Sequence, residues 1–144
     1  MIELVEDRLD IDTYLELRQS VQFRELTRDQ AKKGLSNSLY TLVAFKDGKA
    51  VGMGRIVGDG AIICYVQDLI IRPEVQGEGI GGLILETLKK FVIQEGYEGT
   101  TMMFDLMCAK GREEFYKKHG FSARPTKDLG PGMIQFIQIG SDEQ

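Results

Sequence analysis

The chain contains only two cysteines and one histidine among its 144 residues. Cys64 and Cys108 lie far apart with no Cys-x-x-Cys spacing, so neither a zinc knuckle nor a disulfide framework is supported. Each cysteine lies in an apolar run, which predicts a small buried thiol. His119 precedes Gly120 at the expected end of a helix, where surface residues are common, and we interpret it as structural. No metal site is expected.

Long hydrophobic runs and an excess of positive charge are also missing. No stretch approaches the roughly 18 apolar residues that a membrane span requires, and the acidic N-terminus has too short an apolar run for a signal peptide. Lys and Arg total 18 against 22 Asp and Glu, a net charge of −4. This balance argues against bulk electrostatic binding to nucleic acid or to anionic membranes. We therefore expect a cytoplasmic protein with neither of these partners.

The residues that are present fit one globular domain. Hydrophobic residues make up 42% of the chain and charged residues 28%, and a chain of this size can bury enough surface for one core. We find no repeat, low-complexity segment or linker. The sequence therefore predicts a single domain over residues 1–144.

Hydrophobic periodicity and turn residues divide the first half into two helices and four strands. A short strand near Ile2 precedes a helix over about 10–20. Thr27 begins a second helix with a Thr-x-x-Gln capping box, and Gly34 is its expected end. Asp47-Gly48 predicts a tight hairpin turn. The three strands around this turn are expected over residues 39–45, 50–57 and 61–71, and the last is apolar enough to be buried on both faces.

The second half changes to an alternation of strands and helices. A helix is expected up to about Glu95, then a strand over 100–107 and a helix over about 111–119. Further strands are expected from Phe121 and over 133–139. The sequence thus predicts a mixed α/β fold with about four helices flanking one mixed sheet. An antiparallel meander comes first, followed by a parallel strand–helix–strand crossover, which should be right-handed.

A glycine-rich turn over residues 76–82, Gln-Gly-Glu-Gly-Ile-Gly-Gly, is the most informative segment. It lies between a buried strand and an amphipathic helix. Glycines allow the backbone to curl tightly and bring N–H groups close to a ligand, and the start of a helix adds free N–H donors and a positive dipole end. These features favour a phosphate or pyrophosphate site over a turn that needs glycine only for packing.

The same turn also matches the dinucleotide pattern G-x-G-x-x-G at Gly77, Gly79 and Gly82, with Asp105 about 20 residues further on. Two observations count against a nicotinamide cofactor. Too little chain follows Gly82 for a doubly wound sheet, and an antiparallel meander comes before the motif. A P-loop is excluded because no Gly-Lys-Ser/Thr closes the turn.

Two motifs together resemble the GNAT superfamily of acyl-CoA N-acyltransferases. The main motif of that family is Gln/Arg-x-x-Gly-x-Gly/Ala after a strand that ends in apolar-x-Pro. It appears here over 71–81 as Ile-Arg-Pro-Glu-Val-Gln-Gly-Glu-Gly-Ile-Gly. The second motif, aromatic-Tyr-x-x-x-Gly-Phe, appears over 115–121 as Phe-Tyr-Lys-Lys-His-Gly-Phe. The order of elements also matches, so the resemblance covers nearly the whole chain and implies a GNAT-like fold.

The resemblance implies an N-acetyltransferase that moves the acetyl group of acetyl-CoA, without a metal, to a primary amine by direct attack on the thioester. Tyr116 corresponds to the tyrosine that commonly protonates the leaving thiolate. The strands over 64–71 and 100–107 splay apart in this family, and the thioester lies in the gap. The backbone of Leu69, Ile70 and Ile71 would pair with the pantetheine arm. The pyrophosphate would be held by backbone amides from Gln76, Gly77, Glu78, Gly79, Ile80 and Gly81.

Fewer sequence features identify the general base and the acceptor site than identify the cofactor site. Asp68 lies in an otherwise apolar strand, and it is either a base acting through water or a structural group near a strand bulge, which we favour. Glu25 is another group that could reach the amine. Because side chains alternate along a strand, Tyr65 should face away from Asp68. From the family architecture, the expected walls of the acceptor site are Phe23, Arg24, Arg55 and Tyr65.

The chain departs from the family pattern at Ala109, where many members carry Asn seven residues before the tyrosine. This difference keeps open a catalytically silent acyl-CoA-binding or regulatory module on the same fold. A nucleotide-binding domain that uses Gly77, Gly79 and Gly82 is the third alternative. The expected partner of an active enzyme is a small-molecule or peptide amine, and because family members often dimerise, a homodimer is also implied.

Overall fold

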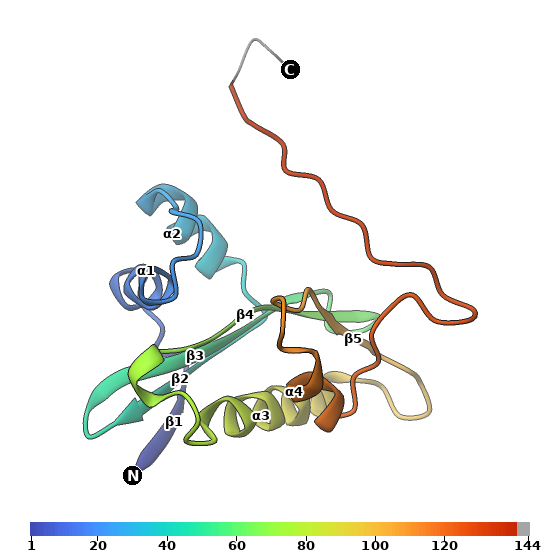
Figure 1. Cartoon of the computed structure of the whole chain (residues 1–144), viewed down its shortest axis with the longest axis horizontal. Helices are drawn as coiled ribbons and strands as arrows, with labels where there is room; N and C mark the ends of the chain where they lie inside the picture. The colour runs from blue at the N-terminus through green and yellow to red at the C-terminus, as the bar shows by residue number, and fades with distance from the viewer. Residues whose placement is uncertain (141–144) are drawn as a thin grey trace. The chain divides into compact units, whose positions relative to one another are not determined.

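The computed structural model describes residues 1–140, which divide into two compact units with the boundary after Leu106. The first unit contains the sheet and most of the helices (Figure 1). Its elements in chain order are β1 (Ile2–Glu6), α1 (Ile11–Ser20), α2 (Arg28–Ser36), β2 (Tyr40–Lys46), β3 (Lys49–Gly58), β4 (Ile63–Ile71), the short 3-10 helix η1 (Pro73–Val75), α3 (Ile80–Glu95) and β5 (Met103–Leu106).

The five strands form one mixed sheet in the order β1-β2-β3-β4-β5. Neighbouring strands from β1 to β4 are antiparallel, whereas β4 and β5 are parallel and joined through α3. This topology confirms the predicted mixed α/β fold, with its meander and its strand–helix–strand crossover. It differs from a doubly wound parallel sheet, and therefore gives no support to the dinucleotide-binding alternative.

Local sequence signals account for the starts of both N-terminal helices. The side chain of Asp10 accepts a hydrogen bond from the Thr13 backbone and caps α1. Thr27 and Gln30 form the predicted capping box of α2. The predicted end at Gly34 is wrong, because α2 continues to Ser36. A glycine lowers helix stability by only about 1 kcal/mol, so packing and capping can carry the helix past it.

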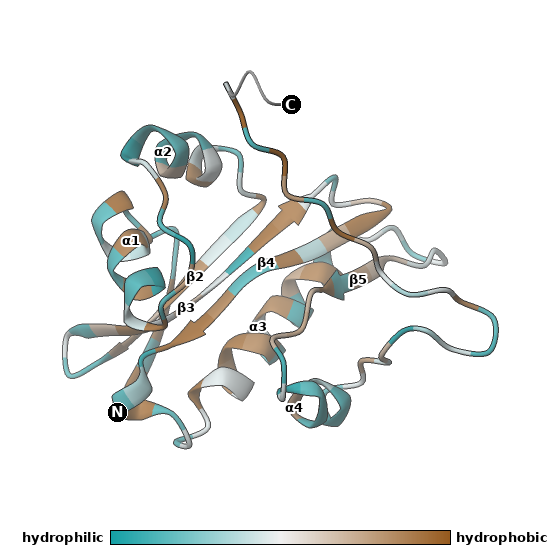
Figure 2. Ribbon diagram, turned by 45° about the horizontal axis from the view of Figure 1, so that its top comes forward, coloured by the Kyte–Doolittle hydropathy of each residue, from teal (hydrophilic) through white to brown (hydrophobic). Residues whose placement is uncertain are grey.

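The core has two parts, one on each face of the sheet. Figure 1 shows α3 on one face and α1 with α2 on the other. Most of the apolar residues lie along the strands and α3 (Figure 2). Gly54 lies on the α3 face, where an added Cβ would come within 2.7 Å of Ile84 Cγ2 and 3.1 Å of Leu88 Cδ1. The missing side chain therefore allows α3 to pack closely against β3.

A bulge in β4 changes which residues share a face. Arg55 pairs with Asp68 and the next residue, Ile56, pairs with Val66, so Gln67 has no partner on β3. The extra residue resets the alternation, and Tyr65 lies on the same face as Asp68. The prediction that these two side chains face opposite ways is therefore wrong. Gln67 is also exposed, so β4 is not buried on both faces along its whole length.

The second unit begins at Met107 and contains the short helix α4 (Glu113–Lys118). The strands predicted from Phe121 and over 133–139 are not formed in the described residues. Strand propensity alone does not make a strand, which needs a partner and a surface to pack on. The apolar side chains between Met133 and Ile139 are 66–87% exposed. Cys108 is also exposed, contrary to the prediction, whereas Cys64 is buried.

No helix within residues 1–140 combines the length and the apolar character that crossing a bilayer requires.

The close packing at Gly54 leads to a test of stability. We expect Gly54→Ala to lower the free energy of unfolding by about 1–3 kcal/mol, since the new methyl group would displace branched side chains of α3. The matched control is Gly34→Ala, where nothing lies within 4 Å of the added Cβ. That helical substitution should raise stability by about 0.5–1 kcal/mol. Urea unfolding of both variants measures the difference, and equal effects would contradict the packing argument.

Candidate functional site

The glycine-rich turn presents an uncapped helix start. Gly77 and Gly79 have φ values of 86° and 85°, a region that favours glycine. Gly79 is the N-cap of α3, and no side chain caps this helix. An added Cβ at either glycine would meet no atom within 4 Å, so space over the turn is open. The first N–H groups of α3 thus lie at the positive end of the helix dipole with room for an anion.

Contacts on both sides hold this turn in place. The Gln76 side-chain amide donates to the Ile71 carbonyl at 3.0 Å. Lys46 Nζ, at the end of β2, lies 2.7 Å from Glu78 Oε1. Before the turn, Arg72 Nε donates to the Ala50 carbonyl at 2.8 Å, and its guanidinium also bonds to a Glu16 carboxylate oxygen. The conformation is therefore preorganised by the protein itself, which fits a phosphate or pyrophosphate group.

One edge of β4 loses its partner strand just before the turn. β5 pairs with β4 only from Ile63 to Val66. On the other edge, β3 continues to pair with β4 as far as Ile71. Within residues 1–140, no strand pairs with β4 from Gln67 to Ile71 on the β5 side. An extended ligand can use such an edge by adding itself as a strand.

Asp68 is the centre of a buried polar cluster at the bulge. Its Oδ2 accepts hydrogen bonds from the Tyr14 hydroxyl at 2.8 Å and from Arg55 Nε at 2.9 Å. Its Oδ1 accepts one from Arg18 Nη1 at 3.1 Å. Burial, and next the charge of Asp68, raise the pKa of Tyr14, so this phenol remains a donor. The cluster ties α1 to β3 and β4, and both carboxylate oxygens are engaged.

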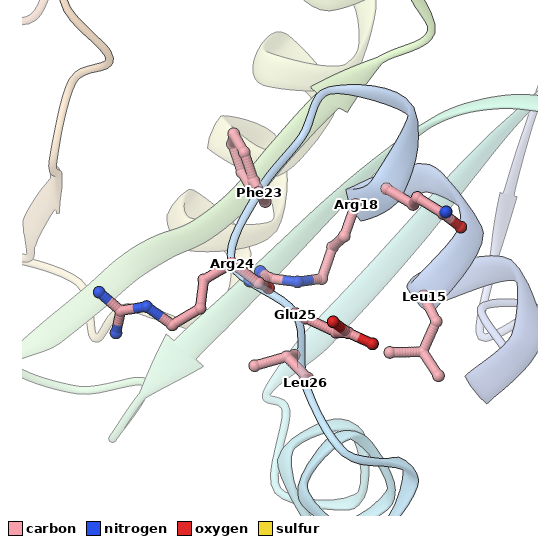
Figure 3. Close-up of a pocket in the computed structure, with 7 residues that line it drawn as sticks. Leu15, Arg18, Phe23, Arg24, Glu25 and Leu26 are labelled. Atoms are coloured by element: carbon pink, nitrogen blue, oxygen red, sulfur yellow. The ribbon is translucent and has the colours of Figure 1, made fainter. Parts of the chain in front are cut away.

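A cavity of about 310 Å³ lies beside this cluster (Figure 3). Arg18 reaches from α1 to the following loop, where Nη2 donates to the Arg24 carbonyl at 2.9 Å. The Arg18 guanidinium also lies 5.4 Å from the centroid of the Phe23 ring, and its Nε is buried without a hydrogen-bond partner. The lining combines apolar and charged side chains from Leu15, Arg18, Gln19, Phe23, Arg24, Glu25 and Leu26.

The residues predicted for the acceptor site do not all lie in this cavity. Phe23 and Arg24 line it, as does Glu25. Arg55 belongs to the Asp68 cluster instead, and its Nη1 donates to the Gly34 carbonyl at 3.1 Å and the Ser38 hydroxyl at 2.9 Å. Tyr65 lies on the same face of the sheet, paired with β5.

Sequence reasoning missed Tyr14 and Arg18 as partners of Asp68. A signal was present, because the two residues are four apart on α1 and therefore share a helix face. Their distance of about fifty residues from Asp68 along the chain hid the connection. Only the packing of α1 on the sheet reveals it.

Tyr116 lies on α4 in the second unit and is half-buried. Its ring packs edge-on against Phe115 and Phe121, with centroid distances of 5.0 and 5.7 Å. Burial is the largest cause of a rise in the pKa of Tyr116. The hydroxyl therefore stays protonated to higher pH than that of an exposed tyrosine, and it is correspondingly a weaker acid.

Comparison with known proteins agrees with this arrangement. Residues 37–123 match the family model described as an acetyltransferase (GNAT) domain. A probable acetyltransferase structure from Staphylococcus aureus is 28% identical, with a TM-score of 0.83 over 95% of this chain and 100% of that one. A GNAT-family acetyltransferase structure from Streptococcus pneumoniae is 29% identical, with a TM-score of 0.78 over 96% of this chain and 99% of that one.

Curated relatives differ in how much of their length is matched. A GCN5-related N-acetyltransferase from Arabidopsis thaliana is 29% identical over 80 residues, which cover 56% of this chain and 30% of that protein. An uncharacterised N-acetyltransferase from Bacillus subtilis is 25% identical over 138 residues, covering 95% of this chain and 94% of that protein. The chain thus spans about a third of the plant relative and nearly all of the bacterial one.

The buried cluster predicts a large effect of Asp68→Asn. Loss of the charge would leave Arg18 and Arg55 without their buried partner, so we expect the free energy of unfolding to fall by about 3–5 kcal/mol. The matched control is Asp12→Asn, because the Asp12–Arg28 ion pair is exposed and screened by water, so its loss should change stability little. Thermal and chemical unfolding of the two variants and the wild type measure these changes in stability. An Asp68→Asn protein of unchanged stability would contradict a structural role.

Proposed function

Because the chain belongs to the GNAT acetyltransferase family, we propose that it is an N-acetyltransferase that uses acetyl-CoA to acetylate a primary amine. The junction of β4 and α3 carries the proposal. There, a helix start with two glycines at positive φ and no side-chain cap follows a strand edge with which no other strand in residues 1–140 pairs. The first feature suits a pyrophosphate, and the second suits an extended arm.

Acetyl-CoA would supply the activated thioester and bind mainly through backbone groups. We assign its pyrophosphate to the amides of residues 76–81, where glycine side chains leave the approach open. We assign its pantetheine arm to the backbone of Leu69, Ile70 and Ile71, on the unpaired edge of β4. The described residues contain no cluster of His, Cys, Asp or Glu suited to a metal ion, and the assignment of roles involves none.

Tyr116 is our candidate for the general acid. Attack of a neutral amine on the thioester carbonyl breaks the C–S bond and leaves a thiolate that needs a proton. We assign that proton to the Tyr116 phenol from its place in the family motif, and a phenol is protonated at neutral pH. For Asp68 we favour the structural role, because its two oxygens already accept three hydrogen bonds.

The acceptor would enter from the face of the sheet that carries α1 and α2. The cavity beside Phe23 and Arg24 offers an aromatic ring, two guanidinium groups and the Glu25 carboxylate for its body. A relative from rice, 24% identical over 126 residues, is named a serotonin N-acetyltransferase. A relative from soybean, 30% identical over 77 residues, is named a histone acetyltransferase. The proposed acceptor class is accordingly a small-molecule or peptide amine.

Location and assembly are further parts of the proposal. Both cysteines are free thiols, which suits a reducing compartment such as the cytoplasm. The Arabidopsis and rice relatives are named as chloroplastic, so the stroma is another such compartment to test. A homodimer is proposed from the resemblance to the family, and size-exclusion chromatography with light scattering tests it.

The turn predicts a selective loss of cofactor affinity in Gly79→Val. A side chain there would impose an unfavourable φ, costing roughly 1–2 kcal/mol of stability, and would project into the space assigned to the pyrophosphate. Gly99→Val is the control, because Gly99 has φ +81° and equally open surroundings but follows the other end of α3. In calorimetry, we expect acetyl-CoA affinity to fall at least about tenfold only in Gly79→Val. Equal affinities in the two folded variants would exclude the turn as the binding site.

Tyr116→Phe tests proton donation, since the change keeps the ring and removes only the hydroxyl. General acid catalysis contributes about 10²–10⁴-fold, and a thiolate is a good leaving group, so we expect kcat to fall by the lower end of that range. KM should change little, as for an interaction made in the transition state. Tyr97→Phe, on an exposed ring, is the control. Equal kcat across the pH range in wild type and Tyr116→Phe would remove Tyr116 from the mechanism.

A further inference from the structure

Asp105 is a second carboxylate on the sheet, and its position follows from the strand register. It lies in β5 and pairs with Tyr65 in the parallel β4–β5 ladder. Its neighbours Phe104 and Leu106 pack into the core on the α3 side. Because side chains alternate along a strand, Asp105 must point to the other face, the one that carries Tyr65 and the Asp68 cluster.

The surroundings of Asp105 contrast with those of Asp68. Asp105 is half-buried, and its Oδ1 is shielded from solvent and accepts no hydrogen bond from residues 1–140, whereas the oxygens of the buried Asp68 accept three. No salt bridge within the described part of the chain includes Asp105. Burial raises the pKa of Asp105, and its own backbone amide partly opposes the rise.

An acceptor oxygen buried without a donor lowers stability, by about 1–3 kcal/mol and by more for a charged group. The raised pKa of Asp105 agrees with this loss of stability. A folded-state pKa above the unfolded value means that ionised Asp105 destabilises the fold once the pH rises through the folded pKa. Oδ1 of Asp105 therefore makes no stabilising hydrogen bond within the described residues. Perturbed groups without an internal partner are candidates for contact with a ligand.

The place of Asp105 also points to the reaction site. The next residue, Leu106, forms the last pair of the ladder with Val66, and beyond this pair no described strand pairs with that edge of β4. That edge is the one assigned to the pantetheine arm. Asp105 thus lies beside the end of the β4–β5 pairing, on the face assigned to the acceptor.

We propose that Asp105 is the general base of acetyl transfer and that it receives the acceptor as a cationic primary amine, an ammonium group that its free oxygen can bind. This inference rests on the N-acetyltransferase function proposed above. It gives Oδ1 of Asp105 a hydrogen-bond donor, which the described residues do not supply. It also narrows the acceptor to amines that arrive protonated at neutral pH.

In the proposed reaction, the ammonium group of the acceptor gives one proton to the Asp105 carboxylate. The neutral amine then forms a bond to the thioester carbonyl carbon. The C–S bond breaks, the thiolate takes a proton from Tyr116, and the nitrogen loses its second proton to water, which restores the phenol. Asp105 then releases its proton to solvent, so the reaction yields the amide, a thiol and one net proton.

The groups around Asp105 define its expected pH behaviour. Tyr65 is the titratable side chain paired with it on the same face. Cys64 lies on the opposite face, and its pKa is raised by burial and then by the charges of Asp59, Glu95 and Asp105. No cation is among the causes that act on the pKa of Asp105. The acid limb of kcat/KM should therefore reflect a carboxyl group that titrates above its ordinary value.

Asp105→Asn tests the inference, with Glu98→Gln on the exposed loop between α3 and β5 as the control. The probes are serotonin, a simple alkylamine and a lysine peptide. For the amine that wild type acetylates, we expect kcat/KM to fall about 100-fold or more in Asp105→Asn and the acid limb to disappear. The acetyl-CoA affinity should stay unchanged. The melting temperature at pH 7 should stay equal or rise, a readout that is independent of activity.

Three outcomes would overturn the inference. A kcat/KM equal to that of the wild type and an unchanged acid limb in Asp105→Asn would show that Asp105 is not the general base. A lower melting temperature at pH 7 would show that Asp105 stabilises the fold, contrary to its unpartnered oxygen. If the wild type binds acetyl-CoA but acetylates none of the three amines, the proposed function fails together with this base. That result differs from the first outcome, in which the wild type is active and Asp105→Asn is equally active.

Discussion

The buried carboxylate of Asp68 is the interaction on which the rest of the first unit depends. It lies at the bulge of β4 and accepts hydrogen bonds from Tyr14 and Arg18 on α1 and from Arg55 on β3. A charge in the interior is tolerated only with such partners. By joining a helix to two strands, the cluster fixes the side of the sheet on which the proposed acceptor cavity forms, and it holds the bulge in register.

The bulge has effects beyond its own residue. Gln67 occupies one extra position, so Tyr65 and Asp68 come to the same face of the sheet. Asp68 and Asp105, which both lie on this face, differ in the hydrogen-bond donors around them. Both oxygens of Asp68 accept hydrogen bonds, whereas Oδ1 of Asp105 accepts none from the described residues. A saturated carboxylate supports structure, while an unsatisfied one is available to a ligand, and this difference separates the positioning group from the proposed reactive group.

The sequence predicted local features well and distant contacts poorly. The order of β1 to β5, the capping box at Thr27 and the glycine-rich turn follow from periodicity and turn chemistry within a few residues. The bulge at Gln67, the partners of Asp68 and the isolation of Asp105 could not be predicted, because each depends on the register between strands or on packing of α1. The strand predicted over 133–139 failed for a related reason, since apolar residues form a strand only where a partner is available.

Arg18 has two roles in one side chain, and this limits how the proposed acceptor site can evolve. One nitrogen holds Asp68 and another holds the Arg24 carbonyl at the cavity. Selection for a new acceptor would meet a stability barrier at Arg18, because any replacement leaves the buried carboxylate short of a donor. Phe23, Arg24 and Glu25 line the cavity from the loop after α1 and form the more adaptable wall. Divergence of specificity among proteins with this network should therefore concentrate in the loop between α1 and α2, while the helix that anchors it stays constant.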